Sequence, residues 1–358
     1  MIKLGKNSKV YIVSPYHNTG GPKSLHQLAN NLIEKGIDVY IVYYWNGIFT
    51  GEKEILFSFC KAKLADCICD MEENILIVSE SQSEVLNHYN KITKCIWWLS
   101  LDFYLTSSLK GGVQKAIQEK GLPSFMQPIM FLKFIMNDPK CLKNLKNLDD
   151  KKLQNIYHMY NCEYEKEYLI KHNVPESKMS YLCGPLEKQY YKIDYETISK
   201  EKQNMVVYNP AKMDMDFLEK VKDELYFLNK NIKFVAIEKM SREQVYQTLK
   251  RAKVYVDFGF FPGPERMPRE AVALYCNIIT STKGSAENDI DVAIPRKFKF
   301  NIKERESVQK VVEMIEKMIT SYDDYVEYGQ NYREKVWNQI QDFSNTISNI
   351  FEVDNETR

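Results

Sequence analysis

The sequence predicts an α/β protein with two successive domains. Short apolar runs of strand length alternate with segments of helical spacing along most of the chain. The alternation pauses once, in the polar stretch 194–203, and then restarts. The length of 358 residues also exceeds that of one ordinary domain. Two αβ domains of similar size are the simplest architecture that satisfies these observations.

The first domain opens with a strand–helix–strand unit. The apolar run 9–15 is typical of a buried parallel strand. Helical spacing at 25–36 stops at Gly36, and a second strand is expected at 38–45. This is a βαβ unit, the building block of Rossmann-like domains. Further strands are expected at 74–80, 94–102, 155–161 and 178–186, with a helix at 163–172.

The segment 123–136 is unusually apolar. A buried helix is the first interpretation. The alternative is a patch that meets a membrane or a lipid-linked acceptor. Lysines in the following stretch 140–152 would favour an anionic surface, although the acids among them dilute this effect.

The second half repeats the alternation. Ser241 is expected to cap its helix, with Glu243 in the first turn. The D-x-D of Asp214 and Asp216 opens a predicted helix, where acids at a helix N-terminus explain it better than a metal site, so we predict no metal. Strands are expected at 204–210, 232–238, 253–259 and 277–281, and helices at 216–229, 241–252 and 268–275.

The C-terminal stretch has helical spacing from Ser307 onward. A helix that packs back across both domains and terminal helices that stay on one domain fit this pattern equally well. We predict a first domain at 1–193, a second at 204–325 and a helical tail at 326–358 that returns toward the first domain.

Composition narrows the class of protein. The net charge of +1 provides no global basic field for nucleic acid. None of the eight cysteines forms a C-x-x-C pair, so we expect reduced thiols rather than a zinc site. No signal-peptide core and no apolar run of about 18 residues is present, so we expect a cytoplasmic protein.

A loop rich in glycine, proline and charge follows the strand predicted at 253–259. In open α/β sheets, ligands bind outside the carboxyl ends of strands. Gly263 would let the backbone approach a ligand or adopt a positive φ, and Pro268 suits the first position of a helix. Arg266 and Arg269 would present forked donors to phosphate oxygens.

Glu270 is expected in the first turn of that helix, where it would accept hydrogen bonds from ribose hydroxyls. A surface turn whose charged residues pair with one another or with water explains the same stretch equally well.

Two stretches resemble GT-B glycosyltransferases, especially the large retaining group that includes polysaccharide and cell-wall transferases. Residues 269–288 read REAVALYCNIITSTKGSAEN, with a glutamate opening a helix as Glu270-Ala271 and a G-x-x-E from Gly284 to Glu287. Residues 14–44 resemble the opening of that fold, with a Gly-Gly loop between strand and helix. One departure is Pro262, which stands where the family usually has a first glutamate.

The resemblance implies two Rossmann-like αβα domains facing a central cleft, with a nucleotide-diphosphate sugar gripped by the second domain. Lys212 and the two arginines would neutralise the diphosphate, and Glu265 would replace the missing glutamate at the sugar hydroxyls. Asn209 stands near the position of a family arginine. Ser285 and the amides at Gly284 would also meet the donor.

The first domain would contribute residues from three strand ends. Gly20 and Gly21 would close onto the diphosphate or sugar, although a tight turn is the ordinary use of such a pair. His17 would deprotonate the acceptor in an inverting enzyme and only contact substrate in a retaining one. Glu80 and Asp102 would bind acceptor hydroxyls, although capping or a loop hydrogen bond is the more ordinary role of Glu80. Trp97 and Trp98 are expected in the core.

The expected function is that of a retaining, metal-independent hexosyltransferase with no cofactor beyond its nucleotide-sugar donor. Its acceptor would be a glycan, a lipid-linked saccharide or a protein, in surface polysaccharide or glycoconjugate synthesis. Peripheral contact with the inner membrane face would pass through 123–136. The alternatives are an inactive GT-B module that binds a nucleotide sugar, a glycan or a partner transferase, and an epimerase of the same fold.

Overall fold

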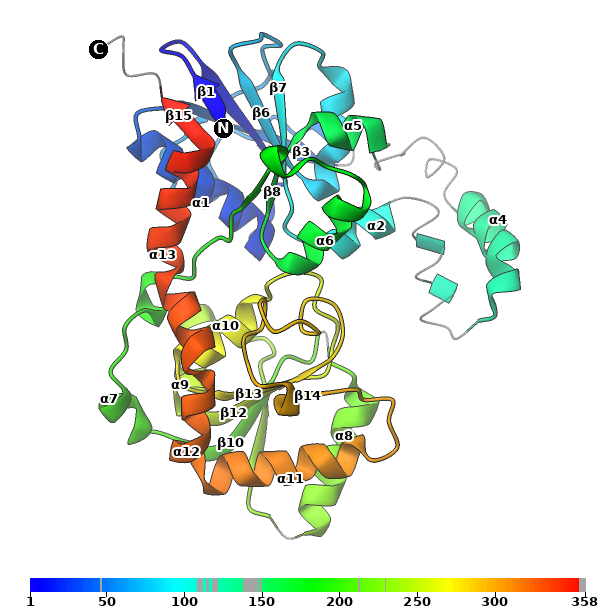
Figure 1. Ribbon diagram of the computed structural model, residues 1–358, viewed down its shortest axis with the longest axis vertical. Helices are drawn as coiled ribbons and strands as arrows, with labels where there is room; N and C mark the ends of the chain where they lie inside the picture. Colours follow the sequence, from blue (N-terminus) through cyan, green and yellow to red (C-terminus); the bar gives the residue numbers. More distant parts are fainter. Residues whose placement is uncertain are drawn as a thin grey trace. The chain divides into compact units, whose positions relative to one another are not determined.

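The protein divides into two compact units. Unit 1 comprises Met1–Gly184 and the chain from Phe343 onward, and unit 2 comprises Pro185–Asp342. The computed structural model (Figure 1) describes residues 1–45, 47–107, 112–113, 116–117, 122–137, 148, 150–211, 213–228 and 230–353.

Unit 1 is built on a mostly parallel sheet. Its strands run in the order β4-β3-β2-β6-β7-β8-β9, and β5 also pairs with β3. Only the short β4 is antiparallel among the described pairings of this sheet. The strands are β2 Lys9–Ser14, β3 Asp38–Trp45, β4 Ile48–Phe49, β5 Lys63–Leu64, β6 Ile75–Ser79, β7 Thr93–Trp97, β8 Tyr157–Tyr160 and β9 Met179–Tyr181.

Apolar side chains cover both faces of this sheet, because a parallel sheet must bury both. On one face, Val10 and Ile12 of β2 share a buried cluster with residues of α1 (Gly20–Glu34). On the other face, Tyr11 and Val13 share one with residues of α2 (Leu101–Ser107) and α6 (Glu163–Lys171). The helices of unit 1 are α1 Gly20–Glu34, η1 Glu80–His88, α2 Leu101–Ser107, η2 Ser124–Met126, α4 Gln127–Asn137, α5 Asp150–Asn155, α6 Glu163–Lys171 and η4 Glu176–Lys178.

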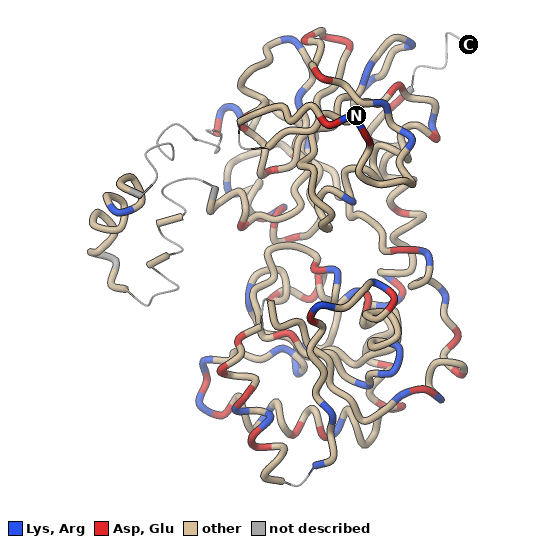
Figure 2. Tube along the Cα trace, turned by 180° about the vertical axis from the view of Figure 1, so that it is seen from behind, with Lys and Arg blue, Asp and Glu red and all other residues tan. Residues whose placement is uncertain are grey.

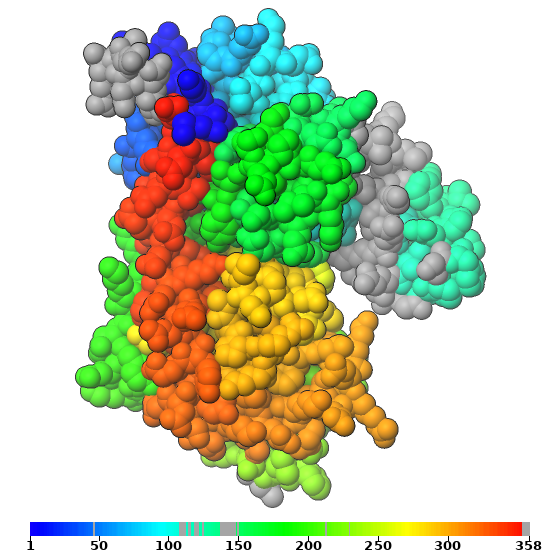
Figure 3. Space-filling model, viewed as in Figure 1, coloured from blue at the N-terminus to red at the C-terminus, as the bar shows by residue number. Residues whose placement is uncertain are grey.

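The two ends of the described chain meet in unit 1. Strand β1 (Ile2–Leu4) pairs in parallel with β15 (Phe351–Val353). The first and last segments therefore lie side by side, blue against red (Figure 3).

Unit 2 carries a five-stranded parallel sheet in the order β11-β10-β12-β13-β14. This order starts near the middle and winds outward in both directions, as doubly wound Rossmann-like sheets do. The strands are β10 Gln203–Tyr208, β11 Lys233–Ala236, β12 Ala252–Asp257, β13 Asn277–Ser281 and β14 Lys299–Phe300. The helices are η5 Lys188–Tyr190, α7 Tyr195–Ser199, α8 Met215–Phe227, α9 Arg242–Arg251, α10 Arg266–Ala273, η6 Arg296–Phe298, α11 Ser307–Thr320, α12 Tyr322–Val326, η7 Glu327–Gly329 and α13 Gln330–Ile350.

The boundary between the units lies earlier than the predicted linker. Leu186, Tyr190 and Ile198 are buried in the core of unit 2, so the polar stretch 194–203 belongs to that unit. The run of polar residues at 194–203 therefore marks a surface segment of unit 2 rather than a domain boundary.

The C-terminal helix also divides differently from the predicted tail. The first part of α13 buries Tyr332 and Val336 in unit 2, whereas Phe343 and Ile347 are buried in unit 1. Unit 2 therefore extends to Asp342 rather than to residue 325, and one helix serves both cores.

The prediction of a buried helix at 123–136 is wrong. The helix forms as α4, but several of its apolar side chains are exposed and only Met130 is buried among those that the structure describes. Helical spacing predicts a helix but not how many neighbours cover it. No helix in the described ranges is long and apolar enough to cross a membrane.

Candidate functional site

Three neighbouring strands of unit 2 end at the same edge of the sheet. Strands β10, β12 and β13 are parallel, so the segments that follow Tyr208, Asp257 and Ser281 emerge together. We call this the unit 2 edge: Asn209, the loop 258–265, the start of α10 and the loop 282–288. It is where ligands bind in open α/β sheets.

The two longer loops of this edge are tied to each other. The amide of Ser285 donates to the carbonyl of Phe261 at 2.9 Å, and its hydroxyl donates to the carbonyl of Gly263 at 2.7 Å. Ser281 donates its hydroxyl to Gly259 at 2.5 Å. A hydroxyl has one proton to donate. The hydroxyl protons of both serines therefore fix the loop backbone, and Ser285 is fully buried.

Gly284 is required by the backbone. Its φ is +63°, and a Cβ at this position would lie 2.1 Å from the carbonyl oxygen of Phe261. No other residue type fits such a contact. The positive φ expected as one use of Gly263 is therefore found at Gly284, and Gly263 has none.

Helix α10 begins two residues earlier than predicted. It starts at Arg266 after Glu265, so Pro268 is its third residue rather than its first. Glu270 is consequently its fifth residue and lies beyond the first turn, contrary to expectation. Pro268 and Glu270 are both buried.

Glu270 is the centre of a charged cluster. Its carboxylate is 1% exposed, and its Oε1 accepts from Arg266 Nε at 3.3 Å and from Nη2 at 3.1 Å. Arg266 also donates to Glu187, and Arg242 Nη1 lies 3.8 Å from the same Oε1. Burial raises the pKa of Glu270, while the Arg266 guanidinium opposes that rise. The cluster thus joins three segments of unit 2 through Glu270 and Arg266.

Arg269 points into the interior of unit 2. It is 6% exposed, its Nη1 donates to Gln339 Oε1 at 2.9 Å, and its Nε donates to the carbonyl of Glu265 at 3.3 Å. These contacts hold α10 against α13. Glu265 itself is half-buried at the start of α10.

The segment after β10 is partly described. The Asn209 side chain accepts from the amide of Ala211 at 3.1 Å, which is a local turn contact. Lys212, expected to contact the diphosphate, lies outside the described residues.

Two residues of the cluster escaped sequence reasoning. Arg242 is the first residue of α9 and directly follows the capping residue Ser241. Its position shortly after a predicted strand is a sequence signal that could have identified it as a site residue. Glu187 is 79 positions from its partner Arg266, and nothing in the sequence links the two.

The predicted residues of unit 1 lie around the ends of β2, β6 and β7, an edge that we call the unit 1 edge. His17 is exposed and packs edge-on against Trp45, with ring centroids 4.5 Å apart. Gly20 and Gly21 open α1, and a Cβ on Gly21 would meet Leu99 at an ordinary 3.6 Å. Gly20 and Gly21 therefore start a helix, but the packing at Gly21 does not require glycine.

Glu80 is a buried acid at this edge. It is 2% exposed, and its Oε2 accepts from the amide of Leu99 at 2.8 Å. Burial raises the pKa of Glu80 to about 7, against hydrogen bonds from backbone amides that include those of Leu99 and Ser100. The loop hydrogen bond expected as its ordinary role is thus observed. Asp102 lies in the first turn of α2.

The tryptophans of this region are core residues, as predicted. Trp97 and Trp98 are fully buried. Trp97 donates to the carbonyl of Leu182 at 2.8 Å, and Trp98 donates to His158 Nδ1 at 2.9 Å. Neither ring is available as a platform for a sugar.

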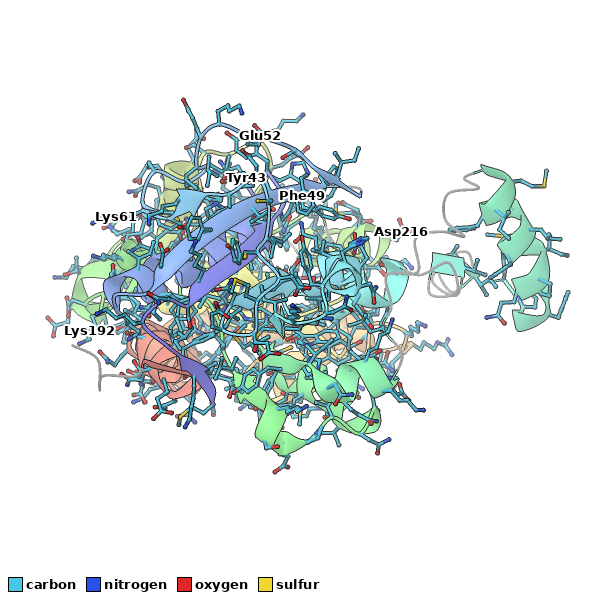
Figure 4. The ribbon with its side chains drawn as sticks, turned by 90° about the horizontal axis from the view of Figure 1, so that it is seen from above. Tyr43, Phe49, Glu52, Lys61, Lys192 and Asp216 are labelled. Atoms are coloured by element: carbon cyan, nitrogen blue, oxygen red, sulfur yellow. The ribbon has the colours of Figure 1, made fainter. Side chains whose placement is uncertain are left out.

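A small hollow of about 240 Å³ also lies in unit 1. Tyr43, Phe49 and Glu52 contribute to its lining and lie near one another (Figure 4). It holds none of the predicted site residues.

The D-x-D has the predicted structural role. Asp214 caps α8, with its Oδ1 accepting from the amide of Phe217 at 3.1 Å. No group of three or more metal-ligand side chains occurs within the described part of the chain.

Comparisons with known proteins now identify the class of fold. A comparison of the sequence with protein-family models and with curated proteins finds no match. Sucrose-phosphate synthase from Thermosynechococcus elongatus aligns with 96% of this chain and 98% of its own, at 10% identity and a TM-score of 0.60. A glycosyltransferase from Rickettsia africae aligns over 96% and 97%, at 10% identity and a TM-score of 0.54.

A third solved structure carries a ligand. Alr3699/HepE from Anabaena, in complex with UDP, aligns with 96% of this chain and 99% of its own, at 10% identity and a TM-score of 0.52. The chain has the GT-B fold of these glycosyltransferases, and the predicted class of two Rossmann-like domains is confirmed.

Proposed function

We propose that the chain is a glycosyltransferase that moves a sugar from a nucleotide-diphosphate sugar to a glycan, lipid-linked saccharide or protein. The observation that carries this proposal is the likeness of nearly the whole chain, 96% of it, to solved glycosyltransferases. One such relative in fold binds UDP. Fold alone does not assign chemistry, so the residues of the unit 2 edge supply the second argument.

Glu270 would hold the ribose of the nucleotide. Within the described residues, its hydrogen bonds and ion pairs all fall on Oε1. Its Oε2 would accept from the hydroxyls of a nucleotide, which requires the side chains around this buried carboxylate to move first. Arg266 would keep this carboxylate ionised and orient it, which is a positioning role rather than the direct phosphate contact first expected.

The diphosphate needs positive charge as it leaves. The bond between the anomeric carbon and the diphosphate oxygen breaks, the new bond forms to the acceptor oxygen, and the acceptor hydroxyl loses its proton. Arg242 is 57% exposed beside Glu270, and Lys212 follows β10 in sequence. Both cations would stabilise the developing charge without a metal.

The remaining assignments rest on the family resemblance. These assignments are retention of the anomeric configuration, a contact of Glu265 with the sugar hydroxyls, and closure of the Gly20-Gly21 turn onto the donor. In an inverting reaction, exposed His17 would act as the base that takes the acceptor proton. We propose no cofactor beyond the donor, a cytoplasmic setting, and a role in polysaccharide or glycoconjugate synthesis.

Donor hydrolysis tests the proposal without knowledge of the acceptor. Purified protein is incubated with UDP-, GDP-, TDP- and CDP-sugars, with and without magnesium, and the released nucleoside diphosphate is measured. We expect slow release from one donor, unchanged by magnesium. We expect at least about tenfold loss in Glu270→Gln, the effect of one hydrogen-bonded contact to the donor. Glu196→Gln, in the exposed first turn of α7, is the matched control.

An inactive binding module is the second candidate. Pro262 occupies the place of a family glutamate, and Arg266 is already paired with two acids. Such a module would bind a nucleotide sugar, raising thermal stability, yet release no nucleotide with any acceptor. Absence of both binding and release across the panel would sink the two candidates together.

A further inference from the structure

A larger hollow of unit 1 lies at the opposite end of its sheet from the unit 1 edge. It has a volume of about 730 Å³, and its lining comes from β1 and from residues at the amino ends of β7, β8 and β9. These three strands are parallel, so their carboxyl ends lie at the other edge of the sheet. We call this cavity the amino-end hollow. Its size is that of a small-molecule site, which is roughly 300–1,000 Å³.

Lysines supply every charged side chain among the described residues that line the amino-end hollow. They are Lys3, Lys94 and Lys178, and neutral polar residues such as Asn90 and Ser177 complete the lining. None of the three lysine side chains has an ion-pair or hydrogen-bond partner within the described part of the chain. The hollow therefore gathers positive charge that the described residues do not neutralise by direct contact.

Asp70 is the acid whose charge acts on Lys94. Burial lowers the pKa of Lys94, and the charge of Asp70 opposes that fall. The oxygens of Asp70 are already occupied, since they accept from the three consecutive backbone amides of 90–92 at 2.9 Å each. Lys94 is therefore a half-buried ammonium whose loss of water is not offset by a direct partner among the described residues.

Lysines without partners in a concave site match a phosphate ligand. A lysine ammonium binds phosphate oxygens as a point charge, whereas bidentate recognition of a carboxylate suits the planar fork of arginine. Three such charges call for more than one negative charge on the ligand, and the hydroxyl and amide groups of the lining can donate to its other oxygens. We propose that the amino-end hollow binds a small molecule that carries at least two phosphate groups.

The distribution of charge over unit 1 favours a small ligand over a nucleic acid. Red and blue segments are interspersed along the described part of this unit (Figure 2), so the excess of lysine is local to the hollow. Nucleic acids bind extended basic surfaces, because the affinity grows with the number of phosphates that are neutralised.

The position of the hollow gives the ligand a structural consequence. Strand β1, which contributes to the lining, pairs with β15 at the other end of the described chain. A molecule bound between β1 and the starts of β7 and β8 would tie both terminal strands to the sheet. This proposal does not depend on the proposed transfer reaction, because the donor residues assigned above to the unit 2 edge take no part in it.

Amide hydrogen exchange of the full chain, followed through a titration with pyrophosphate, tests the proposal at the hollow itself. We expect slower exchange in 90–94 and 177–181, with an affinity that falls as salt screens the lysines. Lys94→Gln with Lys178→Gln should weaken this binding at least about tenfold, through the loss of two charge-assisted contacts. Lys53→Gln is the matched control and should leave the affinity unchanged, because Lys53 lines the smaller hollow of unit 1 together with two acids.

Four results would overturn the proposal. Pyrophosphate could protect neither segment, or it could protect only the loops of the unit 2 edge, which would assign it to the donor site. The control could lose as much affinity as the double variant. Citrate, a carboxylate polyanion compared at equal ionic strength, could bind as tightly as pyrophosphate. Because the substituted lysine side chains have no hydrogen-bond partner among the described residues, all variants should unfold at the wild-type midpoint, and circular dichroism checks this.

Discussion

Glu80 in unit 1 and Glu270 in unit 2 are both almost fully buried near strand ends of a parallel sheet. Their surroundings differ. Glu80 is held by backbone amides, which fix the loop after β7, whereas Glu270 is held by two arginines from α9 and α10. A carboxylate satisfied by backbone amides fixes the loop that carries them, whereas one satisfied by side chains can exchange these partners for a ligand. We therefore propose donor binding at the unit 2 edge.

The glycines of the two edges differ in the same sense. Gly284 has a positive φ and is tightly enclosed, whereas Gly21 begins a helix with ordinary contacts. The unit 2 edge has one backbone geometry that only glycine permits.

The largest effect is expected from Gly284→Ala. The added Cβ would overlap the carbonyl oxygen of Phe261 at a positive φ, so we expect a loss of at least about 3 kcal/mol in the free energy of unfolding. Urea unfolding followed by circular dichroism measures it. Gly21→Ala is the control and should change stability by less than about 1 kcal/mol. Equal effects of the two substitutions would remove the contrast between the edges.

Arg266→Ala should have the next largest effect. Glu270 would lose its closest cation while remaining buried, with Arg242 still 3.8 Å away, and we expect a loss of about 3 kcal/mol. Lys310→Ala breaks an ion pair with Glu306 in which both side chains are exposed, and should cost about 0.5 kcal/mol. If Arg266→Ala cost as little as Lys310→Ala, the buried cluster would not hold unit 2 together.

The pH dependence of Glu80 sharpens the comparison. Its folded pKa of about 7 lies above the ordinary 4.5, so its contribution is fully present below pH 4.5 and lost as pH rises through 7. The loss amounts to about 3 kcal/mol at alkaline pH, because each pKa unit corresponds to about 1.4 kcal/mol. Glu80→Gln keeps an acceptor for the amide of Leu99 and removes the titration.

The variant should therefore gain stability relative to the wild type between pH 5 and pH 8, as chemical unfolding at each pH will test. The difference in stability between Glu80→Gln and the wild type separates the titration of Glu80 from that of His26 and His158. Burial lowers the pKa of both histidines to about 4, and they are present in each protein. A difference that does not change with pH would show that Glu80 is ionised over the whole range.

The smallest effect concerns the helix starts. Ser241 and Gln244 form a capping box at α9, whereas Thr19 makes no side-chain cap at α1. Ser241→Ala should cost about 1 kcal/mol and Thr19→Ala less, in thermal unfolding of the two variants. The reverse order would indicate that capping does not distinguish these helices.

Sequence reasoning located most strands and helices because their apolar runs and spacing are local signals. Strand β2 and the Ser241 cap follow directly from such patterns. The strand expected at 94–102 ends at Trp97 instead. The carbonyl of Ser100 accepts hydrogen bonds from the amides of Phe103 and Tyr104, and helix α2 starts there. Apolar composition alone could not show that turn.

The sequence predicts where the candidate site lies but not which contacts form it. Residues 258–270 follow a strand, which placed them at the sheet edge. The pairing of Arg266 with Glu187 depends on segments distant in sequence, and the bond from Ser285 to Gly263 depends on how two loops pack. Neither leaves a local pattern. The same limit explains the exposure of α4, whose apolar spacing does not reveal how much of it is covered.

Amide hydrogen exchange with and without nucleotide tests the central assignment most directly. UDP, GDP, TDP and CDP would each be added to the full chain, and peptides from both units followed. The account predicts that one nucleotide slows exchange in the loops 258–265 and 282–288 and at the start of α10. No protection by any nucleotide, or protection confined to unit 1, would contradict the assignment of the donor site to the unit 2 edge.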